Sequence, residues 1–231
     1  MAFTSFRFIV FLVLAAAAYF LTPKRCRWVT LFVANYVFYF ISGGRIFIYL
    51  LATTVTTYLA TVKIGDMAAK NKIAFNEAKA ELDKEGKKAW KAAFAKKKKR
   101  ILIPTLLFNF GILAVLKYSG FVTENLNLLF AKIGIGTELP VFRFLLPLGI
   151  SFYTFQSMGY LIDVYREKQE PERNFCKLAL FISFFPQIVQ GPISRFGTLA
   201  EQLFRANEFS YTRIKFGVQL MLWGAFKKMV I

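Results

Sequence analysis

Long apolar runs alternate with short polar breaks along most of this chain. The runs cover residues 2–21, 28–41, 46–62, 101–116, 141–162, 178–193 and 214–231. Soluble domains rarely string apolar side chains into long uncharged runs, whereas a membrane-spanning helix needs about 20 of them. The pattern predicts an all-α, polytopic integral membrane protein with about six or seven membrane segments. We expect the first run to be a retained helix and not a cleaved signal peptide, because further runs follow at once.

The later runs are interrupted by residues that break helices. The breakers are Pro147, Gly149, Pro186, Gly191 and Pro192. Broken helices at membrane depth persist where the backbone is buried in protein or lines a cavity. The second half of the chain is therefore predicted to contain broken or re-entrant helices, and a site is expected there and not in the first three spans. Pro104 is different, because it is expected in the first turn of its span, where proline is tolerated.

Segment 63–100 is the one long hydrophilic stretch, with thirteen Lys or Arg against five Asp or Glu. Its apolar residues recur at steps of three and four, at Phe75, Ala78, Leu82, Ala89, Trp90, Ala93 and Phe94. This spacing predicts an amphipathic helix lying along the membrane face, and a solvated loop helix is the alternative. The basic run 96–100 is expected to attract anionic lipid headgroups. The predicted divisions are three spans in 1–62, this basic amphipathic loop in 63–100, and a part with the remaining apolar runs in 101–231.

The charge of the chain, +18 overall, predicts its orientation. Lys and Arg gather in the cytoplasmic loops of membrane proteins, so segment 63–100 and the basic turn 24–27 are expected inside the cell. The N-terminus and the turn at Gly43 are then outside, in a cell (inner) membrane. The same rule accounts for the basic composition without a nucleic-acid partner, and we expect none.

Cysteine and histidine usage narrows the chemistry. Cys26 and Cys176 are the two cysteines and form no CxxC pair, so neither a disulfide framework nor a metal site is predicted. Cys26, beside a predicted span, is either an inert thiol or a palmitoylation site, and the inert thiol is favoured. The sequence contains no histidine, which excludes a Ser-His-Asp triad, a Cys-His pair and a His-ligated metal within the chain.

Two patterns place polar side chains inside apolar regions. In the first, Gln156, Tyr160 and Asp163 share one helix face at steps of four and three. Polar residues at this depth face protein or water, so the stripe is predicted to line a cavity. Ser151 and Thr154 alone are better explained by hydrogen bonds between helices.

Asp163 has two interpretations: a catalytic carboxylate, or a helix end paired with Arg166. The second pattern, Phe184–Ile193, places Gln187 and Gln190 three residues apart between two prolines. Their amides could bind a carbonyl or a hydroxyl group.

Together these patterns resemble the membrane-bound O-acyltransferase family, in its alginate O-acetyltransferase branch. The resemblance rests on Pro147–Gln156, Tyr160–Arg166, Phe184–Ile193 and Gly224–Lys228. It implies a helical fold around a tunnel and transfer of an acyl group, commonly acetyl, to a hydroxyl of a cell-surface polysaccharide such as alginate. The acyl donor, a thioester such as acetyl-CoA or an acyl carrier, is then a substrate, and no bound cofactor is expected. Extracytoplasmic acetyltransferase proteins are the implied partners.

The resemblance carries over a set of tunnel-lining residues and no catalytic one. The lining residues are Ser151, Tyr153, Gln156, Tyr160, Asp163, Gln187, Gln190 and Gly191. The family's catalytic histidine lies in its later half, and no residue here matches it. Since the chain stops inside an apolar segment, we expect an N-terminal half that needs a His-bearing C-terminal half.

O-acyl transfer needs a base to remove the hydroxyl proton, and Asp163 would serve only if burial raised its pKa. The chain by itself is therefore expected to be inactive. A non-catalytic accessory or partner-binding membrane subunit is the alternative function. A small transporter is disfavoured because the sequence shows no repeated halves.

Overall fold

The computed structural model describes residues 5–80, 83–134, 139–141, 144–188 and 191–230. Within these ranges the chain forms helices and turns and no strand, which confirms the all-α prediction. The α-helices are α1 Phe6–Leu21, α2 Arg27–Gly43, α3 Phe47–Ala78, α4 Lys84–Ile133, α5 Ile150–Tyr165, α6 Phe175–Ser183, α7 Phe185–Ile188, α8 Phe196–Phe204 and α9 Tyr211–Val230. Two short 3-10 helices, η1 Lys24–Cys26 and η2 Gly44–Ile46, flank α2.

Several helix ends follow directly from local sequence. Ser5, Asp83 and Asn174 precede α1, α4 and α6, and each side chain accepts a hydrogen bond from a first-turn amide. Such N-caps satisfy amides that have no partner inside the helix. Gly134 ends α4 with φ of 82°, a left-handed conformation that glycine adopts without steric cost.

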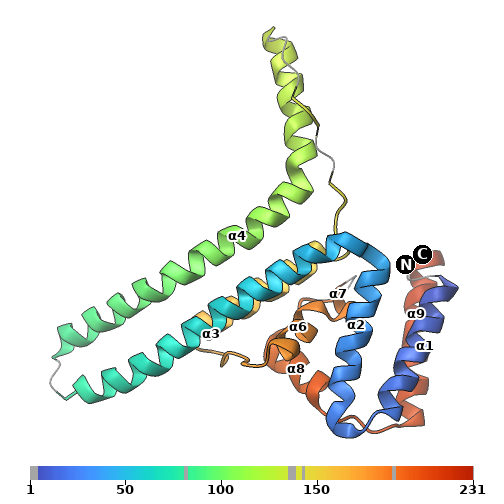
Figure 1. The fold of residues 1–231 in the computed structure, drawn as a ribbon, viewed down its shortest axis with the longest axis horizontal. Helices are drawn as coiled ribbons and strands as arrows, with labels where there is room; N and C mark the ends of the chain where they lie inside the picture. The colour runs from blue at the N-terminus through green and yellow to red at the C-terminus, as the bar shows by residue number, and fades with distance from the viewer. Residues whose placement is uncertain (1–4, 81–82, 135–138, 142–143, 189–190, 231) are drawn as a thin grey trace.

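The helices α3 and α4 form a long antiparallel hairpin (Figure 1). The apolar runs 46–62 and 101–116 each account for only part of these helices, because their polar flanks are rich in helix-forming Ala, Lys and Glu. Segment 63–100 is therefore divided between the two arms, whereas one surface helix was expected. Leu82 lies outside the described residues.

Two other boundaries differ from the prediction. Pro104 lies inside the 50-residue α4 and not in a first turn. Because proline has no amide hydrogen, one backbone hydrogen bond is missing within this continuous helix. The stretch 117–133, which lies between the predicted apolar runs 101–116 and 141–162, continues α4. The run expected to begin at residue 141 becomes helical only at Ile150, after Pro147 and Gly149. The division into 1–62, 63–100 and 101–231 stays a prediction, and α3 and α4 cross its two boundaries.

The body of the molecule surrounds α6, which packs against α2, α3, α5 and α8. The side chains of Leu178, Phe181 and Ile182 on α6 are fully buried. The ring of Phe38 from α2 stacks on that of Phe185, with ring centroids 4.8 Å apart. Figure 1 shows α5 running along α3, while the C-terminal part of α4 stands away from the body.

Among the residues that the structure describes, two helices, α3 and α4, are long and apolar enough to cross a membrane. Large apolar side chains are exposed on several helices, for example Leu14 on α1, Leu107 on α4 and Leu220 on α9. Extensive apolar exposure of this kind marks contact with lipid or protein. The count of six or seven segments stays a prediction.

Candidate functional site

The central feature of the site is the α6–α7 break, residues Ser183–Pro186. Pro186 has no amide hydrogen, so it cannot donate to the Ile182 carbonyl as a continuing helix would require. Phe184 leaves helical geometry with φ of −56° and ψ of 98°. Backbone groups around such a break need other partners, because unpaired buried groups are costly.

Asn35, from the middle of α2, supplies partners on one side of the α6–α7 break. Its fully buried side chain accepts a hydrogen bond from the Phe185 amide at 2.9 Å through Oδ1. Its Nδ2 donates to Ser183 Oγ at 3.3 Å. The Ser183 hydroxyl in turn donates to the Ala179 carbonyl at 2.7 Å. One asparagine thus fixes a chain segment that is 150 residues away in sequence.

Gln156, from α5, supplies a partner on the other side. Its side chain is 3% exposed, and Nε2 donates to the Phe181 carbonyl at 2.7 Å. In a continuous helix this carbonyl would accept from the Phe185 amide, which Asn35 has taken. The amide side chains of Asn35 and Gln156 therefore substitute for helix hydrogen bonds at the break, which makes it a built feature of the fold.

Tyr160 follows Gln156 on the buried face of α5, as its spacing predicted. Its ring lies 4.8 Å from that of Phe196 and 6.0 Å from that of Phe181, between centroids. The hydroxyl accepts a hydrogen bond from the Glu172 amide at 2.7 Å. Tyr160 thus joins α5 to α6, to α8 and to the loop that follows α5.

Asp163, the third residue of the predicted stripe, is half-buried near the end of α5. Its backbone carbonyl accepts from the Lys168 amide at 3.0 Å. Among the described residues no ion pair joins its carboxylate to Arg166, so that pairing is not observed. The helix ends within three residues of Asp163, which agrees with its interpretation as a helix-end residue.

The first turns of α5 hold the other predicted residues. Ser151 is half-buried and Thr154 is buried, and the Ser157 hydroxyl donates to the Thr154 carbonyl at 3.0 Å. Tyr153 is 1% exposed and borders a cavity of about 10 Å³ together with Tyr39. The hydroxyl groups of both tyrosines lack a protein hydrogen-bond partner. A cavity of this size has room for about one water molecule.

Gln187, in α7, pairs with Gly191, which follows that helix. The Gly191 amide donates to the Gln187 carbonyl at 2.7 Å, and Gln187 Nε2 donates to the Pro192 carbonyl at 3.0 Å and to Ser194 Oγ. A Cβ at Gly191 would lie 2.6 Å from the Gln187 carbonyl oxygen, so a side chain does not fit there. Gln190 lies outside the described residues.

Two pairs among the predicted residues have separate hydrogen-bond partners, and their place in one tunnel wall stays a prediction. Gln156 and Tyr160 contact α6, while Gln187 and Gly191 close their own loop, and among the described residues no hydrogen bond joins the two pairs. Asn35 was missed by the sequence analysis. A single amide inside the apolar run 28–41 was the available signal, because a polar residue within a span usually has a polar partner.

An apolar cavity of about 410 Å³ lies beside the α6–α7 break. Its walls come from α1, α2, α8 and the break itself, including Leu12, Leu31, Phe184, Phe185 and Leu203. The volume is within the range of small-molecule sites. Gln202 and Asn207 contribute polar groups to its lining.

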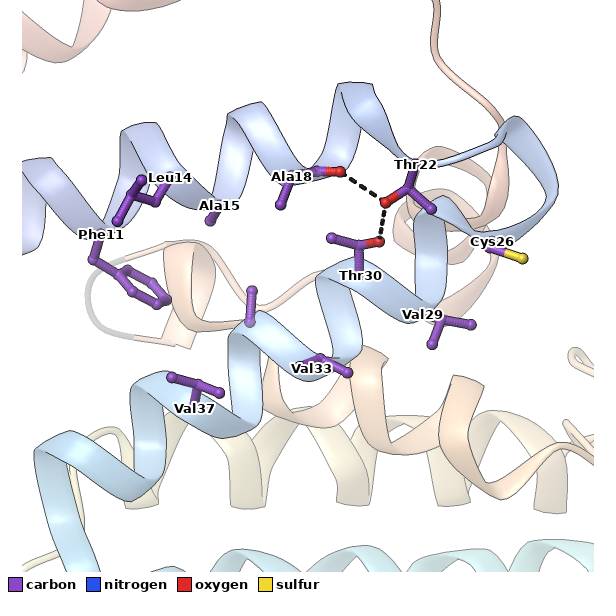
Figure 2. A pocket seen from close by; sticks show the side chains of 11 residues that line it. Phe11, Leu14, Ala15, Ala18, Thr22, Cys26, Val29, Thr30, Val33 and Val37 are labelled. Atoms are coloured by element: carbon purple, nitrogen blue, oxygen red, sulfur yellow. Dashed lines mark hydrogen bonds between the residues drawn. The ribbon is translucent and has the colours of Figure 1, made fainter.

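A second groove of about 410 Å³ runs between α1 and α2 (Figure 2). It is lined by small and apolar side chains, and exposed Cys26 lies at one end. At that end the Thr30 hydroxyl donates to Thr22 Oγ1 at 2.9 Å, and Thr22 Oγ1 donates to the Ala18 carbonyl at 2.7 Å. The preference for an inert thiol over palmitoylation at Cys26 stays a prediction.

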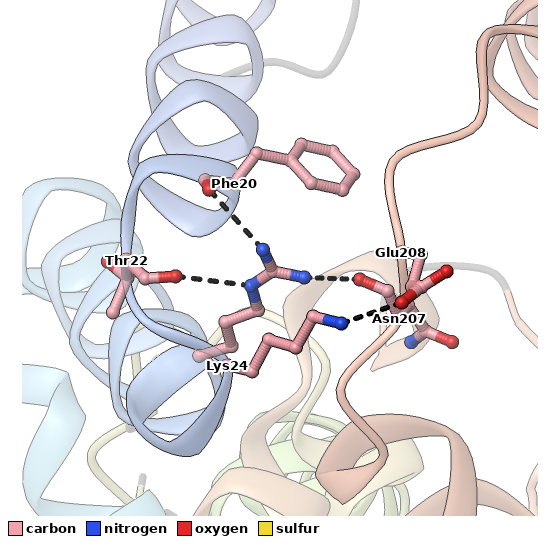
Figure 3. Close-up of polar contacts among 6 residues, drawn as sticks. Phe20, Thr22, Lys24, Asn207 and Glu208 are labelled. Carbon is pink, nitrogen blue, oxygen red and sulfur yellow. Dashed lines mark hydrogen bonds and ion pairs between the residues drawn. The ribbon is translucent and has the colours of Figure 1, made fainter.

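Arg27 ties the α1–α2 turn to the segment before α9. Figure 3 shows Thr22 and Lys24 of that turn facing Asn207 and Glu208. The Arg27 guanidinium donates to the Thr22 carbonyl at 3.2 Å, to the Phe20 carbonyl at 3.4 Å and to the Asn207 carbonyl. Nearby, Lys24 pairs with Glu208 at 2.6 Å, and this ammonium lowers the pKa of the Glu208 carboxyl group. Asn207 also lines the cavity beside the α6–α7 break, so Arg27 links the lining of that cavity to the α1–α2 turn.

In the part of the chain that the structure describes, no group of three or more His, Cys, Asp or Glu could hold a metal ion.

Comparison with known proteins gives relatives that are named as O-acetylases or O-acetyltransferases. The chain is 32% identical over 236 residues to the “Probable alginate O-acetylase AlgI” of Azotobacter vinelandii, covering 100% of this chain and 41% of that protein. The protein of the same name from Pseudomonas aeruginosa is 31% identical, with 100% and 40% covered. A “Peptidoglycan O-acetyltransferase” of Helicobacter pylori is 31% identical over 156 residues, 56% of this chain and 29% of that protein. No family profile and no solved structure matches.

These relatives confirm the resemblance. The chain is similar along its whole length to proteins named as probable alginate O-acetylases. The chain spans about two fifths of the length of the curated relatives that it matches, 41% for the first of them.

Proposed function

We propose that this chain forms part of an O-acetyltransferase that transfers an acetyl group from a thioester donor to a hydroxyl group of a cell-surface polysaccharide such as alginate. The observation that carries the proposal is the match of the whole chain to alginate O-acetylases. The α6–α7 break adds support, because broken helices at membrane depth occur where backbone is buried in protein or lines a cavity.

The role assigned to this chain is positioning, and the base is supplied from outside residues 1–231. O-acyl transfer needs a group that accepts the hydroxyl proton, and imidazole suits neutral pH. The sequence has no histidine, and Asp163 is half-buried at a helix end. Ser151, Tyr153, Gln156, Tyr160, Asp163, Gln187, Gln190 and Gly191 are proposed to line or support the acyl-transfer tunnel.

The proposal places the protein in the inner membrane, with segments 24–27 and 63–100 in the cytoplasm and Gly43 outside. In the view of Figure 1 the turn between α1 and α2 and the tip of the α3–α4 hairpin both lie lower than the α2–α3 turn, on opposite sides of the molecule. The proposed orientation rests on the basic segments. Anionic lipids at 96–100, a His-bearing C-terminal half and extracytoplasmic acetyltransferase proteins are the proposed partners.

Cysteine labelling tests the orientation. In a chain with Cys26 and Cys176 replaced by Ser, a cysteine at Gly43 should react with a membrane-impermeant maleimide in intact spheroplasts. A cysteine at the exposed Lys97 should react only after permeabilisation. The reverse result would invert the proposed topology.

A chimera tests the function. The aligned segment of the Azotobacter alginate O-acetylase is replaced with this chain, and alginate acetylation is measured in a strain that lacks its own enzyme. We expect acetylation above background, and a marked loss with Gln156→Leu at equal membrane abundance. Ile73→Leu, an exposed apolar change on α3, is the control. A chimera that is abundant in the membrane but transfers no acetyl group would favour the alternative, a non-catalytic accessory subunit.

A further inference from the structure

A pocket of about 350 Å³ lies between the arms of the α3–α4 hairpin. Ala68 from α3 and Ala95 from α4 line it, and their short side chains leave space between the helices. We call this space the hairpin pocket. It is separate from the α6–α7 break, and it is built from segment 63–100, the most basic part of the chain.

Three lysines and one carboxylate line the hairpin pocket. Lys98 is 7% exposed, and its ammonium contacts Glu167 Oε1 at 2.5 Å and the Tyr165 carbonyl at 2.9 Å. Lys98 and Glu167 therefore neutralise each other. Lys72 and Lys91 remain exposed, and among the described residues neither has an ion-pair partner. Two positive charges are left facing one hollow.

Aromatic side chains complete the walls. Trp90 is held in place, because its indole Nε1 donates to Asn71 Oδ1 at 3.0 Å and its ring lies 6.1 Å from that of Phe75. The Phe94 ring lies 4.8 Å from the Lys98 ammonium. The pocket thus offers flat apolar surface next to unneutralised ammonium groups. An inorganic anion would use only the ammonium groups, so these walls favour a larger ligand.

We infer that the hairpin pocket binds a phosphate group carried on an apolar or ring-bearing body, with Lys72 and Lys91 contacting the phosphate and the aromatic walls contacting the body. Lysine is a common phosphate ligand, acting as a point charge on a flexible stem. The local net charge of segment 63–100 would raise the concentration of such anions near the pocket. An anionic lipid headgroup and a soluble organic phosphate share this chemistry.

Trp90 fluorescence in the complete 231-residue chain tests the inference. Trp28→Phe and Trp223→Phe leave Trp90 as the single indole. The chain is titrated with ADP in neutral detergent, and it is also placed in nanodiscs of phosphatidylcholine with or without phosphatidylglycerol. We expect a saturable change for ADP, or an emission shift that requires phosphatidylglycerol. The first result identifies a soluble source of the phosphate and the second a lipid source.

Charge-matched variants decide whether the hairpin pocket itself is responsible for the fluorescence response. Lys72→Gln and Lys91→Gln together should weaken the response roughly 25-fold, about fivefold for each lysine near an anionic surface. Lys79→Gln and Lys88→Gln remove the same charge from the same hairpin outside the pocket, and should weaken it less than twofold. Unchanged helical circular dichroism shows that each variant is folded. Equal losses in the two pairs, or no response to either probe, would overturn the inference.

Discussion

The α6–α7 break and the hairpin pocket both place polar side chains between helices, but the two regions differ in how these side chains are buried and paired. At the break, the neutral amides of Asn35 and Gln156 are buried, and each is paired with a backbone group. In the pocket, Lys72 and Lys91 are charged and exposed. Paired neutral groups stabilise one conformation, whereas unpaired charges at a hollow remain available to a ligand. Burial and pairing, and not polarity alone, separate a structural polar residue from a binding one.

The largest effect should come from Asn35→Leu. This change leaves the buried Phe185 amide without its acceptor and Ser183 Oγ without its donor. We expect the free energy of unfolding to fall by about 3 kcal/mol, since an unpaired buried group costs about 1–3 kcal/mol. SDS-induced unfolding followed by circular dichroism measures it. Asn125→Leu, on exposed α4 surface, is the control and should change little. Equal stability of the two variants would show that Asn35 does not hold the break.

Gly191→Ala should have the next largest effect. The new Cβ would lie 2.6 Å from the Gln187 carbonyl oxygen and 2.7 Å from Gln187 Cγ, so the loop after α7 must shift. Overpacking of this kind costs about 1–3 kcal/mol, and we expect about 2. Gly111→Ala on α4, where a Cβ meets nothing within 4 Å, is the matched control and should be neutral or slightly stabilising. Melting of both variants in the same detergent tests the difference.

Lys98→Met tests whether the buried lysine of the hairpin pocket stabilises the fold, in contrast to the exposed lysines near it. Removing the ammonium leaves the Tyr165 carbonyl without this donor and ends the pair with Glu167. Because Glu167 is 58% exposed, solvent screens the pair, and we expect a loss of only about 1 kcal/mol. Lys96→Met removes an exposed charge two residues away and should leave stability unchanged. Similar melting curves for the two variants would place Lys98 with the solvated lysines.

The smallest effect concerns the pair between Lys24 and Glu208. Lys24 lowers the pKa of Glu208, so the pair contributes above the ordinary carboxyl pKa and its contribution is lost as pH falls through the lowered value. Hydrogen exchange at residues 206–210 should therefore be faster, relative to the intrinsic rate, at acidic pH than at pH 7. Glu208→Gln should remove this pH dependence. Both side chains are exposed, and a dependence that persists in Glu208→Gln would assign it to another group.

Particular residues show how far the candidate site was predictable. The i, i+4 spacing of Gln156 and Tyr160 correctly predicted one shared face, because helix geometry follows from local sequence. Their partners could not be predicted, since Phe181, Phe196 and Glu172 lie on other elements. The hydrogen bond from the Gly191 amide to the Gln187 carbonyl was not predicted either. The assignment of both residues and Gln156 to one tunnel wall stays a prediction.

The sequence by itself determined the all-helical class, the break at Pro186 and the family to which the relatives belong. These properties depend on near neighbours or on residue order. Apolar runs predict the helices, the missing N–H of proline predicts the break, and motifs with fixed spacing indicate the family. The tertiary structure alone decided that Asn35 meets Phe185 across 150 residues, and that segment 63–100 divides into two arms around a hollow. The physical reason is that a buried polar group takes whichever partner packing brings within about 3 Å, and packing depends on the whole chain.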